Sequence, residues 1–201
     1  MVLGIRHGLV ANPGHVVYAR LPGFGLAPEG REAAADLART LARAPVAAVV
    51  ASPLERAVET AEILAAPHGL PVSTDERLLE WSFWGRWAGV TWERIRERDP
   101  DLLDVYAADP GAANPGDTLA DAARGVLAWA DGAEAAHRGA LVLGVSHEAP
   151  LAAALLAGRG EGFDRFHAVR VPHLACVRLR PGPTELVDPA SIPPTAGRQA
   201  G

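Results

Sequence analysis

Short hydrophobic runs alternate with longer amphipathic stretches along most of this chain. The short runs predict strands at 2–6, 46–51, 71–74 and 140–145, and the runs 46–51 and 140–145 are expected to be buried. The longer stretches place apolar residues three or four positions apart, or begin with helix-start signals, and predict helices at 28–43, 53–67, 118–137 and 150–159. Two later runs, 173–180 and 185–187, predict edge strands.

Strands that alternate with helices indicate an α/β fold, a three-layer α/β/α sandwich with a mainly parallel central sheet. We expect a single domain over residues 1–188. The segment 76–117 is irregular, with short helical pieces near 91–98 and 101–108, and is expected to form an insertion over the active site. Residues 189–201, rich in proline and glycine, predict a flexible C-terminal tail.

Composition narrows the class of protein. Of the 201 residues, 49% are hydrophobic and 21% charged, which is typical of a globular chain, and the net charge of −5 argues against a nucleic-acid partner. All 19 basic residues are arginine, which excludes Schiff-base lysine chemistry. The single cysteine, Cys176, lies in an apolar run and is expected to be a buried, inert thiol. We find no signal peptide and no membrane-spanning stretch, so we expect a cytoplasmic protein with no membrane partner.

Three predicted strands end in polar motifs, which are Arg6-His7-Gly8, Ser52-Pro53-Leu54-Glu55-Arg56 and Ser146-His147-Glu148. The carboxyl ends of parallel strands meet at one edge of a sheet, where ligands bind. A phosphoryl group in transfer needs several cationic donors around one nucleophile. Arg6 and Arg56 can provide forked donors and His147 a further one, while His7 can attack phosphorus through a ring nitrogen. Gly8 allows a sharp backbone turn beside that imidazole.

Together with Ala57, Thr60 and Ala61, these motifs resemble the histidine phosphatase superfamily, the phosphoglycerate mutase-like group, in its branch with the Arg-His-Gly motif. The resemblance covers residues 2 to about 187. It implies a phosphoglycerate mutase-like fold, a phosphohistidine on His7, a phosphate pocket of Arg6, Arg56 and His147, and no metal or cofactor. It also implies a phosphate contact from Asn12, although Pro13-Gly14 beside it equally favours a simple turn.

The chain departs from the family pattern at Leu9, Val10 and Glu148, which border the expected phosphate ligands. These changes leave the reaction class in place and the substrate open.

The expected reaction also needs an acid that protonates the leaving oxygen. Glu80 matches the position of the proton donor in one branch of the family, and Glu148 matches the position in the other. Because the remaining motifs resemble the first branch, we favour Glu80 as the acid, with Glu148 as the alternative.

Four of the five tryptophans, with one phenylalanine, gather just after Glu80, at Trp81, Phe83, Trp84, Trp87 and Trp92. One interpretation is that they pack the insertion onto the sheet. The other is an aromatic wall against the leaving group, so that Trp81 and Trp84 join Gly8, Asn12 and Glu148 as candidate substrate-binding residues. On this interpretation the leaving group is partly apolar or aromatic.

The sequence therefore predicts a metal-independent phosphomonoesterase that acts on a small-molecule phosphate ester through His7. The alternatives are a phosphoglycerate mutase-type phosphotransferase and a non-catalytic phosphate-ester-binding protein. The apolar C-terminal strand region is compatible with a homodimer.

Overall fold

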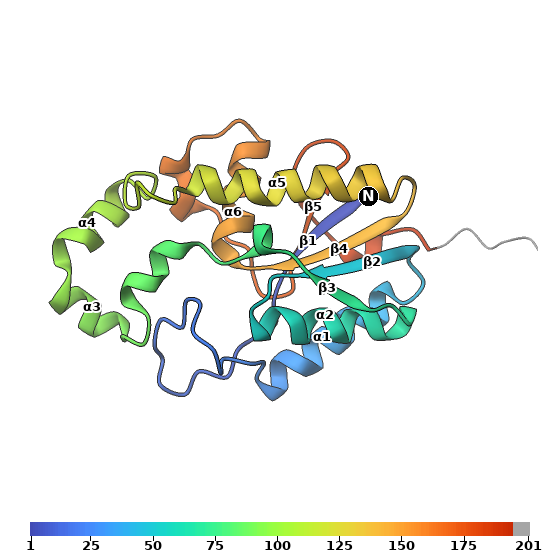
Figure 1. Ribbon diagram of the computed structural model, residues 1–201, viewed down its shortest axis with the longest axis horizontal. Helices are drawn as coiled ribbons and strands as arrows, with labels where there is room; N and C mark the ends of the chain where they lie inside the picture. Colours follow the sequence, from blue (N-terminus) through green and yellow to red (C-terminus); the bar gives the residue numbers. More distant parts are fainter. Residues whose placement is uncertain (195–201) are drawn as a thin grey trace, which may run out of the picture.

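A computed structural model describes residues 1–194 and contains one six-stranded sheet with helices on both faces (Figure 1). The strands are β1 (Val2–Arg6), β2 (Val46–Ala51), β3 (Val72–Thr74), β4 (Leu141–Ser146), β5 (Cys176–Arg180) and β6 (Glu185–Val187). The α-helices are α1 (Pro28–Leu41), α2 (Glu55–Ala65), α3 (Trp92–Arg98), α4 (Pro100–Ala108), α5 (Leu119–Ala136) and α6 (Glu148–Gly158). Short 3₁₀ turns are η1 (Ala66–His68), η2 (Glu76–Leu78), η3 (Ser82–Trp87), η4 (Phe163–Ala168) and η5 (Pro189–Ser191).

The order of strands across the sheet is β3-β2-β4-β1-β5-β6. The four strands from β3 to β1 are parallel, and β5 and β6 each run antiparallel to their neighbour. The prediction of a mainly parallel sheet is therefore confirmed. The prediction that β5 is an edge strand is wrong, because β5 pairs with β1 on one side and β6 on the other.

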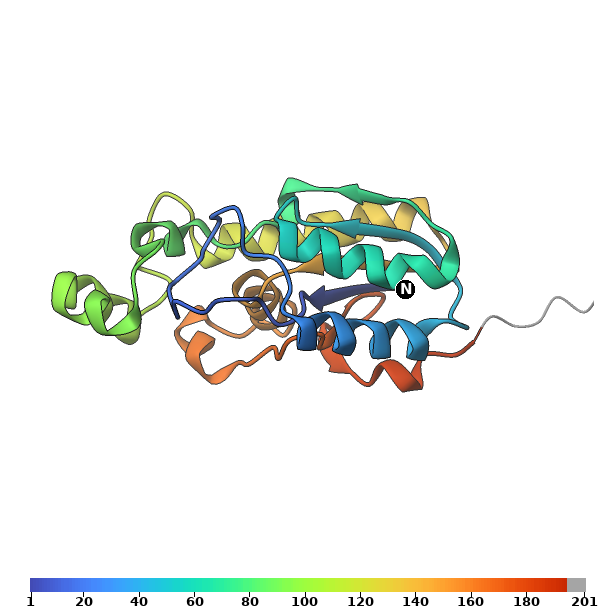
Figure 2. The same ribbon diagram turned by 90° about the horizontal axis from the view of Figure 1, so that it is seen from below.

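Helices α1 and α2 cover one face of the sheet, and α5 and α6 cover the other (Figures 1 and 2). The alternation of side chains along a strand divides the core in the same way. In β1, Leu3 and Ile5 pack with α1 and α2, whereas Val2 packs in the cluster that contains α5 and α6. This is the predicted three-layer α/β/α sandwich.

The two central strands approach α5 and α6 closely at a pair of glycines. Gly4 of β1 lies opposite Gly144 of β4. A β-carbon at Gly144 would lie 2.1 Å from the indole ring of Trp129, and one at Gly4 would lie 2.6 Å from Leu151. Only glycine at these positions lets the helices pack so near to the sheet.

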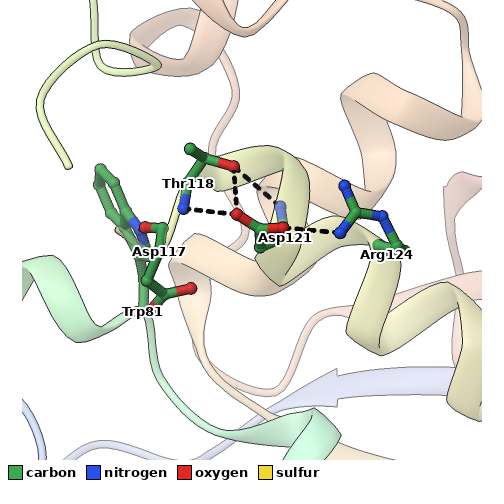
Figure 3. A network of polar contacts seen from close by, with 5 residues as sticks. All are labelled: Trp81, Asp117, Thr118, Asp121 and Arg124. Atoms are coloured by element: carbon green, nitrogen blue, oxygen red, sulfur yellow. Dashed lines mark hydrogen bonds and ion pairs between the residues drawn. The ribbon is translucent and has the colours of Figure 1, made fainter. Parts of the chain in front are cut away.

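The segment with α3 and α4 extends beyond the strand ends (Figure 1). Figure 3 shows how it joins α5: the Trp81 indole N–H donates to the Asp117 carbonyl at 2.6 Å, next to the first turn of the helix. Thr118 and Asp121 form a capping box there, with the Asp121 backbone N–H donating to Thr118 Oγ1 at 3.1 Å. Hydrogen bonds from Thr118, and then from Arg124, lower the pKa of Asp121 to about 2.

Helix α2 differs from the sequence-based expectation at its start. The run Ser52-Pro53-Leu54-Glu55 is typical of a helix that is capped by Ser52 and begins at Pro53, but the helix begins at Glu55 after an extended Leu54. The Ser52 hydroxyl lies 2.8 Å from His147 Nε2 instead, so a contact within the site has replaced a local helix cap.

The C-terminal segment also differs from the expectation of a flexible tail. Residues Pro189–Ser191 form η5, capped by the Asp188 side chain, and Ile192 packs against the core on the side of α1 and α2. The last part of the predicted tail, 195–201, lies outside the described residues.

Cys176 begins β5 and is buried, with 1% of its surface exposed. Burial raises the pKa of its thiol to about 12, in agreement with the predicted inert thiol. Among the described helices, none combines the length and the apolar character that crossing a bilayer requires.

Candidate active site

The three polar motifs meet where β1, β2 and β4 end side by side. The His7 backbone N–H donates to the Ser146 carbonyl at 3.0 Å, and the Ser52 N–H donates to the Val145 carbonyl at 2.8 Å. The parallel register thus brings His7, Ser52 and His147 to one edge of the sheet.

His7 is held in one tautomer. Its Nδ1 lies 2.8 Å from the Gly8 carbonyl oxygen, which can only accept, so Nδ1 carries the proton. The other nitrogen, Nε2, accepts from Arg56 Nε at 3.2 Å. Burial, followed by the charge of Arg56, holds the pKa of His7 well below its usual range. The imidazole is therefore neutral, with an unprotonated Nε2 beside a cation.

Gly8 fixes the backbone around this imidazole. A β-carbon at Gly8 would lie 2.9 Å from the Gly30 carbonyl oxygen, so the position has no room for a side chain. Its N–H donates to Thr60 Oγ1 at 3.0 Å, and that hydroxyl donates to the Arg56 carbonyl at 2.7 Å. Gly8 thus positions the site through its backbone, and Thr60 links it to α2. The Thr60 role was missed, although the residue stands in the Ser-Pro-x-x-Arg-Ala-x-x-Thr motif.

Arg56 is a buried cation with neutral neighbours. Only 1% of its surface is exposed, its second terminal nitrogen donates to the Ala19 carbonyl at 2.7 Å, and its guanidinium lies 4.8 Å from the Tyr18 ring centre. Ala19 presents that carbonyl from a left-handed conformation, with φ of 42°. A desolvated guanidinium without a carboxylate in these contacts is well prepared to bind an anion.

His147 completes the buried end of the site. Its ring centre lies 5.1 Å from that of His7, and its Nε2 is 2.8 Å from Ser52 Oγ. Its Nδ1 is buried and has no hydrogen-bond partner among residues 1–194. Burial, and then the charge of Arg56, holds the pKa of His147 well below its usual range. His147 also precedes the N-terminus of α6, where the helix dipole favours negative charge.

Arg6 lies nearer the solvent and already has partners. Its NH1 donates to the Val171 carbonyl at 2.8 Å and lies 3.0 Å from the Glu148 carboxylate. Arg170 is 3.9 Å from the same carboxylate. Glu148 therefore pairs with a predicted phosphate ligand.

Glu80 is the carboxyl group that burial affects most strongly. It is 9% exposed, and its Oε1 accepts from the Trp81 N–H at 2.8 Å. Burial raises the pKa of Glu80 to about 7, against the opposing influence of Arg56. Arg20 fixes the backbone by donating to the Glu80 carbonyl at 2.7 Å. A carboxyl group with this pKa can both give and take a proton near neutral pH.

Four of the candidate groups border one cavity of about 360 Å³, whereas the buried Arg56 and His147 are not part of its lining. Arg6, His7, Glu80 and Glu148 line it, together with Asn12, His15, Val16, Val17, Tyr18, Ala19, Trp84 and Trp92. The cavity thus contains the expected nucleophile and both candidate acids. Arg56 touches the nucleophile from the buried side.

Of the predicted substrate-binding residues Asn12, Trp84 and Trp81, the first two line the cavity and the third is buried in the core. Asn12 lines the cavity, but its side chain also closes a turn, accepting from the Val16 N–H at 3.2 Å and donating to the Val16 carbonyl at 2.8 Å. Trp84 lines the cavity as expected. The position of Trp81 does not fit its predicted role in substrate binding, because it is 1% exposed and packs in the core against Phe83. The aromatic cluster is thus part core and part cavity wall.

His173 was missed as a neighbour of the nucleophile. His173 precedes β5, the strand that pairs antiparallel with β1, and its ring centre lies 5.5 Å from that of His7. Its Nε2 is buried with no partner among the described residues. Burial lowers the pKa of His173 to about 4. The antiparallel return of the chain causes this contact, and no local motif signals it. Within residues 1–194, no group of three or more His, Cys, Asp or Glu side chains is placed to hold a metal ion.

Comparisons with known proteins agree with this geometry. The sequence profile of the histidine phosphatase superfamily (branch 1) matches residues 2–187. The chain belongs to this superfamily. It is 39% identical over 152 residues to an uncharacterized protein of Mycobacterium tuberculosis, covering 73% of this chain and 72% of that protein. It is 35% identical over 136 residues to the glucosyl-3-phosphoglycerate phosphatase of Mycolicibacterium vanbaalenii, covering 67% of this chain and 49% of that protein.

Among solved structures, YhfR of Bacillus stearothermophilus superposes with a TM-score of 0.81 at 25% identity, covering 94% of this chain and 96% of that one. The phosphoglycerate mutase-like fold expected from the motifs is therefore confirmed, and this superfamily member is similar in sequence to a phosphatase.

Proposed function

We propose that this superfamily member is a metal-independent phosphomonoesterase that acts on small-molecule phosphate esters through a phosphohistidine on His7. The observation that carries the proposal is the neutral His7 imidazole. Its Nδ1 proton is bound by the Gly8 carbonyl, and its unprotonated Nε2 accepts from Arg56 beside a cavity that also holds a carboxyl group with a pKa near neutrality.

In the first displacement, His7 Nε2 attacks phosphorus while the bond from phosphorus to the ester oxygen breaks. Arg56 Nε turns from the imidazole to a phosphoryl oxygen, and Arg6 and the free His147 Nδ1 bind the other oxygens. Glu80 donates its proton to the leaving oxygen, so that a neutral alcohol departs.

In the second displacement, the Glu80 carboxylate removes a proton from water as the water oxygen attacks phosphorus. The bond between phosphorus and Nε2 breaks, which releases inorganic phosphate and restores both His7 and the protonated acid. The tautomer fixed by Gly8 is the same before and after the cycle.

The cavity favours a phosphatase over a mutase. A phosphoglycerate mutase must hold a carboxylate and a second phosphate in addition to the transferred group, which requires further cations. Apart from Arg6 and two histidines, no basic side chain lines the 360 Å³ cavity in the described part of the chain. The sequence similarity to a glucosyl-3-phosphoglycerate phosphatase also supports a phosphatase rather than a mutase.

The test is hydrolysis of p-nitrophenyl phosphate in the presence of EDTA, with His7→Ala alongside. We expect the wild-type protein to release phosphate and the variant to lose at least about 10³-fold in kcat/KM, because removing a nucleophile abolishes the covalent route. Denaturation in alkali during turnover should trap phosphate on wild type alone, as a base-stable and acid-labile phosphohistidine.

Three results would overturn parts of this proposal. Equal turnover by His7→Ala would exclude the covalent route. Transfer of phosphate to the second hydroxyl of a phosphoglycerate, with none to water, would establish the mutase. Binding of phosphate esters without trapping or turnover would establish the non-catalytic protein.

A further inference from the structure

A second cavity adjoins the catalytic cavity. This cavity, here called the outer groove, has a volume of about 340 Å³ and is lined by Trp84, Trp92, Tyr106, Glu148, Ala149, Phe166, His167, Val169 and Arg170. It shares Trp84, Trp92 and Glu148 with the catalytic cavity. A group attached to a phosphoryl group at His7 is therefore close to walls that the two cavities share.

The walls of the outer groove are largely aromatic and come from separate parts of the chain. Trp84 belongs to η3, Trp92 to α3 and Tyr106 to α4, whereas Phe166 and His167 belong to η4. The segment with α3 and α4 thus forms one wall, and the connection after α6 forms the other.

Packing against the core holds these rings in place before any substrate binds. The Tyr106 ring stacks on Phe83 with centres 5.0 Å apart, and Phe83 is fully buried. The His167 ring meets the Tyr106 ring edge-on at 4.8 Å, and its Nε2 lies 2.9 Å from the Tyr106 carbonyl. A preformed aromatic groove binds a ring at a low cost in conformational entropy.

Trp92 is the exposed member of this set. It is 49% exposed, it meets Trp84 edge-on at 5.7 Å, and it lines the catalytic cavity, the outer groove and the next open cavity. Two other tryptophans of the cluster, Trp81 and Trp87, are almost wholly buried. The exposed Trp92 ring is therefore available to contact a bound group, and the rings of Trp81 and Trp87 are not.

Charge in the groove is compatible with an uncharged ring. The acidic group in the lining, Glu148, is already paired with Arg6 and lies near Arg170. The polar side chains of the lining are Glu148, His167 and Arg170, and the other six are aromatic or aliphatic. A sugar needs many hydrogen-bond partners, whereas an aromatic ring needs the flat apolar surfaces that are present.

We propose that the outer groove binds an aromatic ring of the leaving group, so that the preferred substrates are phosphate monoesters of alcohols with an aromatic ring a few bonds from the ester oxygen. This inference rests on the phosphomonoesterase proposed above. Trp92 is the specificity-determining residue, and Trp84 and Tyr106 complete the ring site.

The test compares phenethyl phosphate with ethyl phosphate, since both release a primary alcohol and only the first carries a ring. We expect wild type to favour the phenethyl ester by about tenfold in kcat/KM, since a well-placed aromatic contact and the burial of a ring supply a gain of this order. Trp92→Ala should lower this preference by about fivefold, and Trp92→Phe should retain most of it. Leu186→Ala, which removes a side chain of similar exposure (44%) on β6, should leave the preference unchanged.

Failure of this inference is distinguishable from failure of the proposed function. If wild type hydrolyses p-nitrophenyl phosphate but treats both esters alike, or prefers a sugar phosphate to the phenethyl ester, the ring site is wrong and the phosphatase stands. If no ester is hydrolysed, calorimetry with phenethylphosphonate and ethylphosphonate decides the ring site without turnover. Equal affinity for the two phosphonates, unaffected by Trp92→Ala, would overturn it.

Discussion

The phosphate end of the cavity and the outer groove are built from different kinds of structure. His7 and His147 follow central strands of the sheet, Arg56 lies in the first turn of a helix on the sheet, and all three are almost fully buried. The outer groove comes from short helices and turns beyond the sheet, and its principal side chain, Trp92, is half exposed.

This difference suggests that the rigid phosphate end sets the rate of reaction for every ester, whereas the outer groove sets the choice among esters. Hydrogen bonds from several elements fix the groups that are proposed to contact the phosphoryl group, so a change there should affect every ester in the same proportion. The rings of the groove contact only what is attached to the phosphate, so a change there should alter the choice among esters.

The largest expected effect tests the acid at the phosphate end. Glu80→Gln should lower kcat for ethyl phosphate by about 10²–10⁴-fold, because an amide cannot protonate a poor leaving group. The first displacement of p-nitrophenyl phosphate should suffer less, because its leaving group needs no proton. The matched control is Glu148→Gln, for which we expect a smaller loss. A greater loss in Glu148→Gln than in Glu80→Gln, measured by steady-state kinetics, would move the acid role to Glu148.

Arg56→Lys tests whether the phosphate end treats all esters alike. Lysine keeps the charge but loses the fork that reaches His7, Ala19 and a phosphoryl oxygen together, so kcat/KM should fall by about 10²-fold. The loss should be equal for phenethyl and ethyl phosphate. A change in the ratio of the two would show that the two ends of the cavity are not independent.

The pH dependence of ethyl phosphate hydrolysis also distinguishes the phosphate end, which contains Glu80, from the outer groove, which contains Trp92. Burial raises the pKa of Glu80 to about 7, so the acid is protonated below that pH and ionised above it. For ethyl phosphate, kcat/KM should therefore fall above about pH 7, approaching tenfold per pH unit. Glu80→Gln should lack this decline, and Trp92→Ala should keep it. A decline that persists in Glu80→Gln would assign it to another group.

The smallest expected effect concerns the junction between the two regions. Thr118→Ala removes the capping box of α5 beside the contact between Trp81 and Asp117, and the loss of an N-cap should lower Tm by about 2–4 °C. We expect the ratio of the two esters to stay unchanged, because the rings of the groove pack on Phe83. A shifted ratio would show that this junction also sets the position of the groove. Calorimetry and the paired kinetics check both statements.

Much of the sheet could be predicted from the sequence, because buried parallel strands appear as apolar runs. The bounds of β1, β2 and β6 agree with the predicted runs. The position of β5 inside the sheet could not be predicted, because the pairing of a strand depends on distant partners. The same is true of Ser52, whose local pattern favours a helix cap while the distant His147 determines its actual contact.

The candidate site divides in a similar way. Residues that directly follow a strand, such as His7 and His147, are placed together by topology alone, and the sequence is sufficient to predict that. His173 approaches His7 from an antiparallel connection, so its proximity depends on a return of the chain that no short motif encodes. The aromatic residues of the cluster look alike in the sequence, but Trp81 is buried and Trp92 is exposed. This difference depends on tertiary packing, so the sequence does not predict it.

The burial of Cys176 has a practical consequence for spectroscopy. It is the single cysteine of the chain, and with a pKa of about 12 it offers almost no thiolate to a maleimide at neutral pH. The sequence also contains no lysine, so amine-reactive dyes meet no side-chain amine. Asp104 is exposed and lines the open cavity beside Trp92. In the Asp104→Cys variant, the introduced thiol would therefore be the one side chain that reacts readily with a maleimide dye. A fluorophore there could report the arrival of a ring without disturbing the wild-type chemistry at His7.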